Sequence, residues 1–97
     1  MVASAPSRLR FGPYEIERKL GHGMTDVYLA FDAAQDRRAV LKLIRHSTAA
    51  RMIIDAERRG ASIQQQLHVF DPRVIEVYDF GDLEGCFYVA IDRKSVV

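Results

Sequence analysis

The chain has 97 residues, which suffices for one small domain with a modest hydrophobic core. Its 14 basic and 13 acidic residues leave a formal net charge of +1, so the sequence lacks the basic surface expected of a partner for nucleic acid or for a membrane. No apolar run is long enough to cross a bilayer, and the single cysteine, Cys86, excludes an internal disulfide. We therefore expect a cytoplasmic protein.

The first segment, residues 1–11, is expected to be a flexible leader, and the domain itself is predicted to span residues 12–93, with a short tail at 94–97. After Gly12-Pro13, apolar and polar residues alternate up to Leu20. This period of two predicts a half-buried strand with Tyr14, Ile16 and Leu20 on one side.

A glycine pair, Gly21 and Gly23, follows this strand and leads into a second strand, Val27 to Phe31. Because glycines have no side chain, backbone N–H groups there can approach an anion closely. The third predicted strand, Ala39 to Ile44, carries Lys42 among apolar residues, where it could supply a charge to a phosphate. The order strand, glycine loop, strand and lysine strand indicates a nucleotide site; the alternative is a glycine-turn hairpin with an exposed lysine and no ligand.

From Ser47 or Thr48, either of which could be the N-cap, the apolar period changes to that of an α-helix. Its predicted apolar face comprises Ile53, Ala56, Gly60, Ile63 and Leu67. After Asp71-Pro72, two further strands are predicted at Val74–Phe80 and Cys86–Ile91. The sequence thus predicts an α+β fold: a five-stranded antiparallel sheet with one packed helix between strands 3 and 4.

Glu57 lies beside the predicted apolar face of the helix. A carboxylate at the margin facing the sheet could reach Lys42, which would keep the ammonium extended toward a phosphate. The alternative is a solvated glutamate that pairs with Arg51 or Arg58. The isolated histidines His22, His46 and His68 give no metal-ligating pattern, so we expect no metal site.

Five segments in this order resemble the N-terminal lobe of bacterial Ser/Thr protein kinases of the eukaryotic-like type. They are the glycine-rich loop Leu20–Gly23 with Val27–Ala30, the lysine strand Ala39–Lys42, the helix glutamate Glu57, the strand Val74–Gly81, and the strand Phe87–Asp92 that would enter the hinge. The resemblance covers the chain from Tyr14 to about Asp92.

This resemblance implies an ATP site. Leu20, Val27 and Val40 would enclose the adenine, and Gly21 and Gly23 would let the loop lie over the phosphates. It further implies that Lys42 contacts the α- and β-phosphates and is positioned by Glu57. Ile91 would occupy the gatekeeper position, and backbone groups of Asp92 would hydrogen-bond the adenine edge.

The glycine loop departs from the family pattern, because it is one residue shorter and lacks the third glycine. Thr25 and Asp26 stand in that neighbourhood. A carboxylate near a phosphate should weaken nucleotide binding unless the Asp26 side chain points outward.

In the family, the catalytic aspartate and the Mg²⁺ ligands belong to the His-Arg-Asp and Asp-Phe-Gly segments of the large lobe, which we expect to lie outside this chain. We therefore expect no catalytic residue here, weak ATP binding, Mg²⁺ binding only with a large lobe, and no kinase activity by these residues alone. A truncated kinase domain is the first interpretation. The alternatives are a stand-alone nucleotide-binding or regulatory module that docks on another kinase or scaffold, and a small α+β interaction domain. The exposed inter-lobe face should recruit a C-lobe or another protein.

Overall fold

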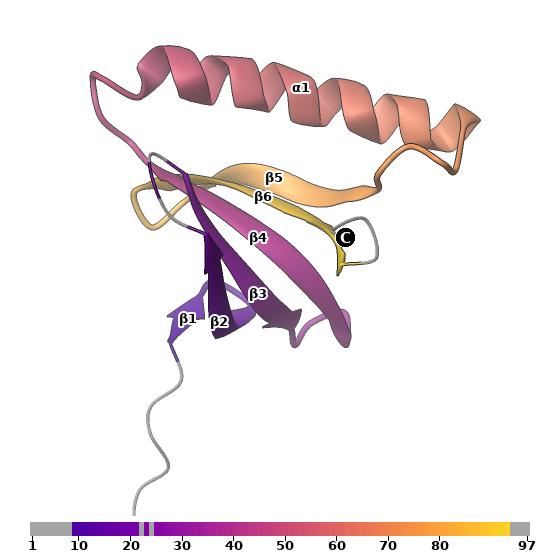
Figure 1. Cartoon of the computed structure of the whole chain (residues 1–97), viewed down its shortest axis with the longest axis horizontal. Helices are drawn as coiled ribbons and strands as arrows, with labels where there is room; N and C mark the ends of the chain where they lie inside the picture. The colour runs from indigo at the N-terminus through magenta and orange to yellow at the C-terminus, as the bar shows by residue number, and fades with distance from the viewer. Residues whose placement is uncertain (1–8, 22, 24, 94–97) are drawn as a thin grey trace, which may run out of the picture.

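The computed structural model describes residues 9–21, 23 and 25–93; the predicted tail and most of the predicted leader lie outside these residues. A single antiparallel sheet with strand order β1-β2-β3-β4-β6-β5 carries helix α1 along one face (Figure 1). The elements are β1 (Arg10–Phe11), β2 (Tyr14–Gly21), β3 (Asp26–Asp32), β4 (Arg37–Arg45), α1 (Arg51–Phe70), β5 (Val77–Leu83) and β6 (Cys86–Asp92). The predicted α+β class is confirmed. Within the described residues, no helix is long and apolar enough to cross a membrane.

The sheet has six strands among the described residues, so the prediction of five strands is wrong. The additional strand is β1, whose two residues fall in the segment that the sequence assigned to the leader. Phe11 is 6% exposed, and its ring packs edge-on against Tyr88 with centroids 5.7 Å apart. A two-residue strand has no periodicity to detect, and its partner Tyr88 is far away in sequence.

Helix α1 begins at Arg51, later than predicted, and its N-cap is Ala50 rather than Ser47 or Thr48. The Ser47 hydroxyl oxygen instead accepts a hydrogen bond from the Ala50 N–H at 3.0 Å. Ser47 thus closes the turn that precedes the helix, with a bond of the kind that an N-cap makes.

The buried face of α1 is rotated from the predicted one. Ile54 and Ala61 are the buried residues of the helix, whereas the predicted Ile63 and Leu67 are 54% and 48% exposed. The neighbours Ile53 and Ile54 lie about 100° apart on a helix, so either could start an apolar face, and only packing against the sheet distinguishes them.

Strand β2 twists where its register with β3 shifts, between Ile16 and Arg18 and again between Lys19 and Gly21. Tyr14 and Ile16 pack in the core on one side, but Leu20 lines a small pocket with Val40 on the other. The prediction that Leu20 lies on the same side as Tyr14 and Ile16 is therefore wrong, because a β-bulge interrupts the alternation of side chains. Strand β5 also begins at Val77 rather than at Val74.

The hydrophobic core has two parts, one on each face of the sheet. The part beneath α1 comprises Ile44, Ala50, Ile54, Ala61, Val77, Phe87 and Val89. The part on the opposite face comprises Phe11, Tyr14, Ala30, Ala39, Leu41 and Ala90. Strands β4 and β6 contribute to both, so they form the centre of the domain.

A polar cluster ties α1 to the sheet. The Arg58 guanidinium donates to both carboxylate oxygens of Asp82 in β5, at 2.8 and 2.9 Å. His46 Nε2, from the segment between β4 and α1, lies 2.7 Å from Asp82 Oδ1. The Arg58 guanidinium also lies over the Phe87 ring, 4.8 Å from its centroid. Because Arg58 directly follows Glu57 in α1, this cluster also helps to hold Glu57 in place over the sheet.

We expect Asp82→Asn to lower the free energy of unfolding at pH 7 by less than about 1 kcal/mol, because the pair is exposed to solvent. The hydrogen bond from Arg58, with a further contribution from His46, lowers the pKa of Asp82. A lowered pKa in the folded state stabilises the fold above the unfolded-state pKa of about 3.9, and this contribution is lost as pH falls through the folded-state value.

The measurement is urea unfolding of wild type and Asp82→Asn at pH 7, 5 and 3. The difference between them should be present at pH 7 and 5 and should shrink at pH 3. Asp36→Asn, at an exposed turn residue, is the control for the loss of one carboxylate. An Asp82→Asn effect no larger than that of the control at pH 7 would contradict the role of the cluster.

Candidate functional site

The register of the central strands gathers most of the predicted site residues on one face of the sheet. Lys42 in β4 is the Cα partner of Val27 in β3 and of Val89 in β6. In antiparallel strands, directly opposite residues place their side chains on the same face. Lys42 therefore stands in a row between two valines.

The next row on the same face is apolar throughout, since residues two apart along a strand share a face. Val40 is the Cα partner of Leu29 in β3 and of Ile91 in β6. Val40 is 2% exposed and so belongs to the core as well as to this face. The face thus combines an apolar platform with one ammonium group.

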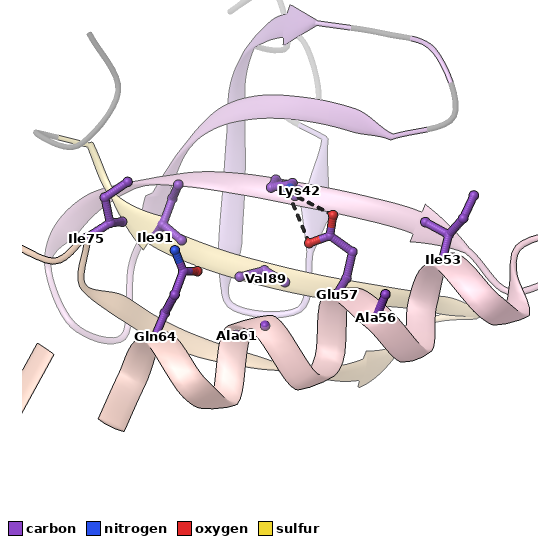
Figure 2. A pocket seen from close by; sticks show the side chains of 10 residues that line it. Lys42, Ile53, Ala56, Glu57, Ala61, Gln64, Ile75, Val89 and Ile91 are labelled. Atoms are coloured by element: carbon purple, nitrogen blue, oxygen red, sulfur yellow. Dashed lines mark hydrogen bonds and ion pairs between the residues drawn. The ribbon is translucent and has the colours of Figure 1, made fainter. Parts of the chain in front are cut away.

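Glu57 reaches this face from α1 and meets Lys42. Lys42 Nζ donates to both Glu57 carboxylate oxygens, at 3.2 and 3.3 Å (Figure 2). The two side chains are 32% and 34% exposed, so solvent still reaches both groups. The predicted ion pair is present in the structure; that Glu57 positions Lys42 for a ligand stays a prediction.

A cavity of about 500 Å³ opens between α1 and the sheet beside this ion pair. In Figure 2, Lys42 and Glu57 point toward each other across it, and Ile91 lies toward the end marked by Gln64. Its lining residues are Lys42, Ile53, Ala56, Glu57, Gly60, Ala61, Gln64, Ile75, Val89 and Ile91. The cavity is therefore open and mainly apolar, with one cation and one carboxylate that meet between the sheet and α1.

Seven of the ten lining residues were not predicted as site residues: Ile53, Ala56, Gly60, Ala61, Gln64, Ile75 and Val89. Ala61 and Gln64 lie four and seven positions after Glu57, on the same helical face. That spacing from Glu57 could have identified them. Ile75 was predicted within a strand, but it precedes β5 and so carried no positional signal.

The loop between β2 and β3 is described only in part, since His22 and Met24 lie outside the described residues. Gly21 is the Cα partner of Val27, so the hairpin closes beside the row of Lys42. Gly23 has φ +133°, a conformation that residues with a side chain rarely adopt. Gly21 thus stands in the row of Lys42, and the backbone conformation of Gly23 favours a residue without a side chain.

Leu20 and Val40 line a separate pocket of about 190 Å³ together with Leu29, Arg18 and Arg93. This pocket lies at the Val40 row, whereas residues of both rows line the larger cavity, Lys42 and Val89 from one and Ile91 from the other. The structure therefore brings Leu20 to Val40 through the bulge in β2.

The backbone of Asp92 is partly engaged within the chain. Its N–H donates to the Glu76 carbonyl at 3.0 Å, and Asp92 is the Cα partner of Ala39. A ligand could therefore use the Asp92 N–H only by displacing this hydrogen bond. That backbone groups of Asp92 hydrogen-bond the adenine edge stays a prediction.

The tripeptide Asp79-Phe80-Gly81 has the same sequence as the Asp-Phe-Gly segment of the kinase large lobe, but it lies in β5. Asp79 is the Cα partner of Ala90, which is in the core on the face opposite Lys42. Its carboxylate accepts a hydrogen bond from the Tyr88 hydroxyl at 2.7 Å. Burial and this hydrogen bond raise the pKa of Tyr88, so the hydroxyl keeps its proton. Asp79 therefore has a structural role and does not face the site.

Comparison with known proteins finds bacterial kinases. The chain is 35% identical to the serine/threonine-protein kinase PknE of Mycobacterium tuberculosis over 92% of its length, which is 16% of PknE. It is 34% identical to PknD of M. tuberculosis over 82% of its length and 32% identical to PrkC of Bacillus subtilis over 84%. In both cases it spans 12% of the relative. No protein-family model matches the chain.

We expect Lys42→Met to change the free energy of unfolding by less than about 1 kcal/mol, because an ion pair this exposed contributes little. Leu41→Ala, at the adjacent position, should cost about 2–5 kcal/mol, because Leu41 is fully buried on the opposite face. Chemical denaturation of the two variants and wild type measures both values.

A Lys42→Met variant as unstable as Leu41→Ala would show that Lys42 serves the fold. A small change in the free energy of unfolding would mean that the Lys42 ammonium is not needed for folding, which would support a role for Lys42 in binding a ligand.

Proposed function

We propose that this chain, which is a homologue of the bacterial serine/threonine protein kinases, is the ATP-binding small lobe of such a kinase domain. The full-length relatives are about six or more times longer than the part aligned with this chain. A kinase activity for this chain is therefore part of the proposal. ATP-dependent phosphoryl transfer to protein Ser/Thr is the reaction in which this lobe would take part.

The observation that supports the proposal most is the Lys42–Glu57 ion pair at the wall of the cavity. An ammonium held extended by a carboxylate on another element can contact phosphate oxygens without first being drawn from an apolar surface. The α- and β-phosphates would lie beside Lys42, beneath the backbone at Gly21 and Gly23. Glu57 would keep the ammonium in place.

The adenine would lie along the apolar row. Leu20 and Val40 would enclose the ring, with Val27 at the neighbouring row and Ile91 at the back. The Asp92 carbonyl oxygen would accept a hydrogen bond from the adenine amino group. These assignments follow the resemblance residue by residue and agree with the register of β3, β4 and β6.

Phosphoryl transfer itself needs groups that these residues do not supply. A catalytic aspartate and the ligands of Mg²⁺ would come from a large lobe. Asp79 begins an Asp-Phe-Gly sequence, but its side chain lies on the face of the sheet opposite Lys42. We expect no catalytic residue in this chain, weak ATP binding by the 97 residues, and Mg²⁺ binding only with a large lobe. A cytoplasmic location belongs to the same proposal.

A docking role is the second candidate function, and an exposed apolar stripe on α1 favours it. Ile63, Leu67 and Phe70, spaced four and three residues apart, are 54%, 48% and 85% exposed. Either a C-lobe or another protein, such as a kinase or a scaffold, would cover this surface. The stripe fits a stand-alone regulatory module as well as a lobe of a larger domain.

We expect ATP to raise the melting temperature of the wild-type chain in a saturable manner, and Lys42→Met to weaken the apparent affinity about tenfold, because a hydrogen bond to a charged group is lost. Arg10→Met is the matched control: it removes an exposed cation of β1 that pairs with Glu15, remote from the cavity. It should bind ATP as wild type does.

Thermal-shift titration with ATP, repeated with isothermal calorimetry, makes the measurement. The absence of any saturable ATP effect in wild type would remove the nucleotide function. Equal losses in Lys42→Met and Arg10→Met would indicate only a general charge effect.

A further inference from the structure

The glycine hairpin, formed by β2 and β3, carries the Asp26 carboxylate that the sequence analysis expected near the phosphates, and the structure shows where this carboxylate lies. Asp26 precedes Val27, the Cα partner of Lys42. Because side chains alternate along a strand, Asp26 and Tyr28 stand on the face of the hairpin opposite Lys42. The Asp26 side chain thus points outward.

Lys19 of β2 completes a cluster on that outer face. Lys19 is the Cα partner of Tyr28, so both share the face with Asp26. Lys19 Nζ lies 3.3 Å from Asp26 Oδ1 and 5.8 Å from the centroid of the Tyr28 ring. The side chains of Lys19 and Asp26 are 48% and 44% exposed. One cation thus neutralises the carboxylate and is itself held over an aromatic ring.

We propose that Lys19 is a positioning residue: it holds and neutralises the Asp26 carboxylate on the outer face of the glycine hairpin, so that a nucleotide phosphate bound beneath the hairpin does not meet an uncompensated negative charge. This inference rests on the proposed nucleotide function. It assigns Lys19 no contact with the nucleotide. Its effect passes through Asp26.

The charges distinguish this role from a purely structural one. An exposed ion pair contributes little to stability, so removal of Lys19 should leave the fold intact. The carboxylate would then act on the phosphates through the hairpin, by unfavourable charge–charge interaction. If Lys19 acted instead by contacting phosphate, the loss of affinity in Lys19→Met would remain when Asp26 is also made neutral.

The test is a double-mutant cycle of Lys19→Met and Asp26→Asn in the 97-residue chain, with ATP as the probe. Lys19→Met should weaken ATP binding about two- to fivefold, which corresponds to one partly screened charge. Asp26→Asn should bind at least as well as wild type. The double variant should bind ATP about as wild type does, because the net charge of the pair is again zero. Arg10→Met is again the control for the loss of one cation.

A double variant that binds ATP as weakly as Lys19→Met would overturn the inference, because Lys19 would then act on the nucleotide directly. No weakening in the wild-type background would overturn it as well.

A second readout needs no nucleotide. The carboxyl carbon resonance of Asp26 at pH 7 should shift in Lys19→Met relative to wild type and should not shift in Arg10→Met. An unchanged resonance would overturn the pairing itself. If none of the variants binds ATP while the resonance still shifts, the proposed function has failed and the pairing stands.

Discussion

The contact between the Lys42 ammonium and the Glu57 carboxylate joins the two layers of this domain at its candidate site. One partner belongs to the central strand of the sheet and the other to the only helix of the described residues. The two side chains can meet only when α1 has one particular position over the sheet and one particular rotation about its own axis. The buried Ile54 and the Arg58–Asp82 pair set that placement, one through packing and the other through charge. The site therefore depends on how the helix is seated.

The sheet supplies the other half of the constraint. Regular pairing of β4 with both β3 and β6 puts a charged row and an apolar row on one face. The opposite face of the same strands, with Leu41 and Ala90, forms a fully buried part of the core. A phosphate and a base need different surroundings, and two adjacent rows provide both. The irregular part of the sheet is β2, whose bulges bring Leu20 toward the apolar row and leave Lys19 on the outer side.

Much of this was predictable from sequence, because it depends on local periodicity and on pairs of unusual residues. A lysine in an apolar strand and a lone glutamate beside an apolar helix face pointed to their contact, and the order of the elements from β2 to β6 followed from alternation. The errors have a common cause in tertiary packing. Strand β1 is too short to show a period, the choice between Ile53 and Ile54 as the buried residue depends on the sheet, and the bulges of β2 shift Leu20 without changing its sequence neighbours. The outward direction of Asp26 likewise became evident only from the register.

The most direct test of the central claim is to ask which lysine a bound nucleotide touches. An ATP derivative with a reactive acyl phosphate transfers its acyl group to an amine beside the phosphates, and peptide mapping identifies the modified residue among Lys19, Lys42 and Lys94. We predict acylation at Lys42 that excess ATP suppresses and that Glu57→Gln reduces. Labelling of Lys19 or Lys94 in preference to Lys42, or labelling of Lys42 that ATP does not suppress, would contradict a phosphate site at the Lys42–Glu57 pair.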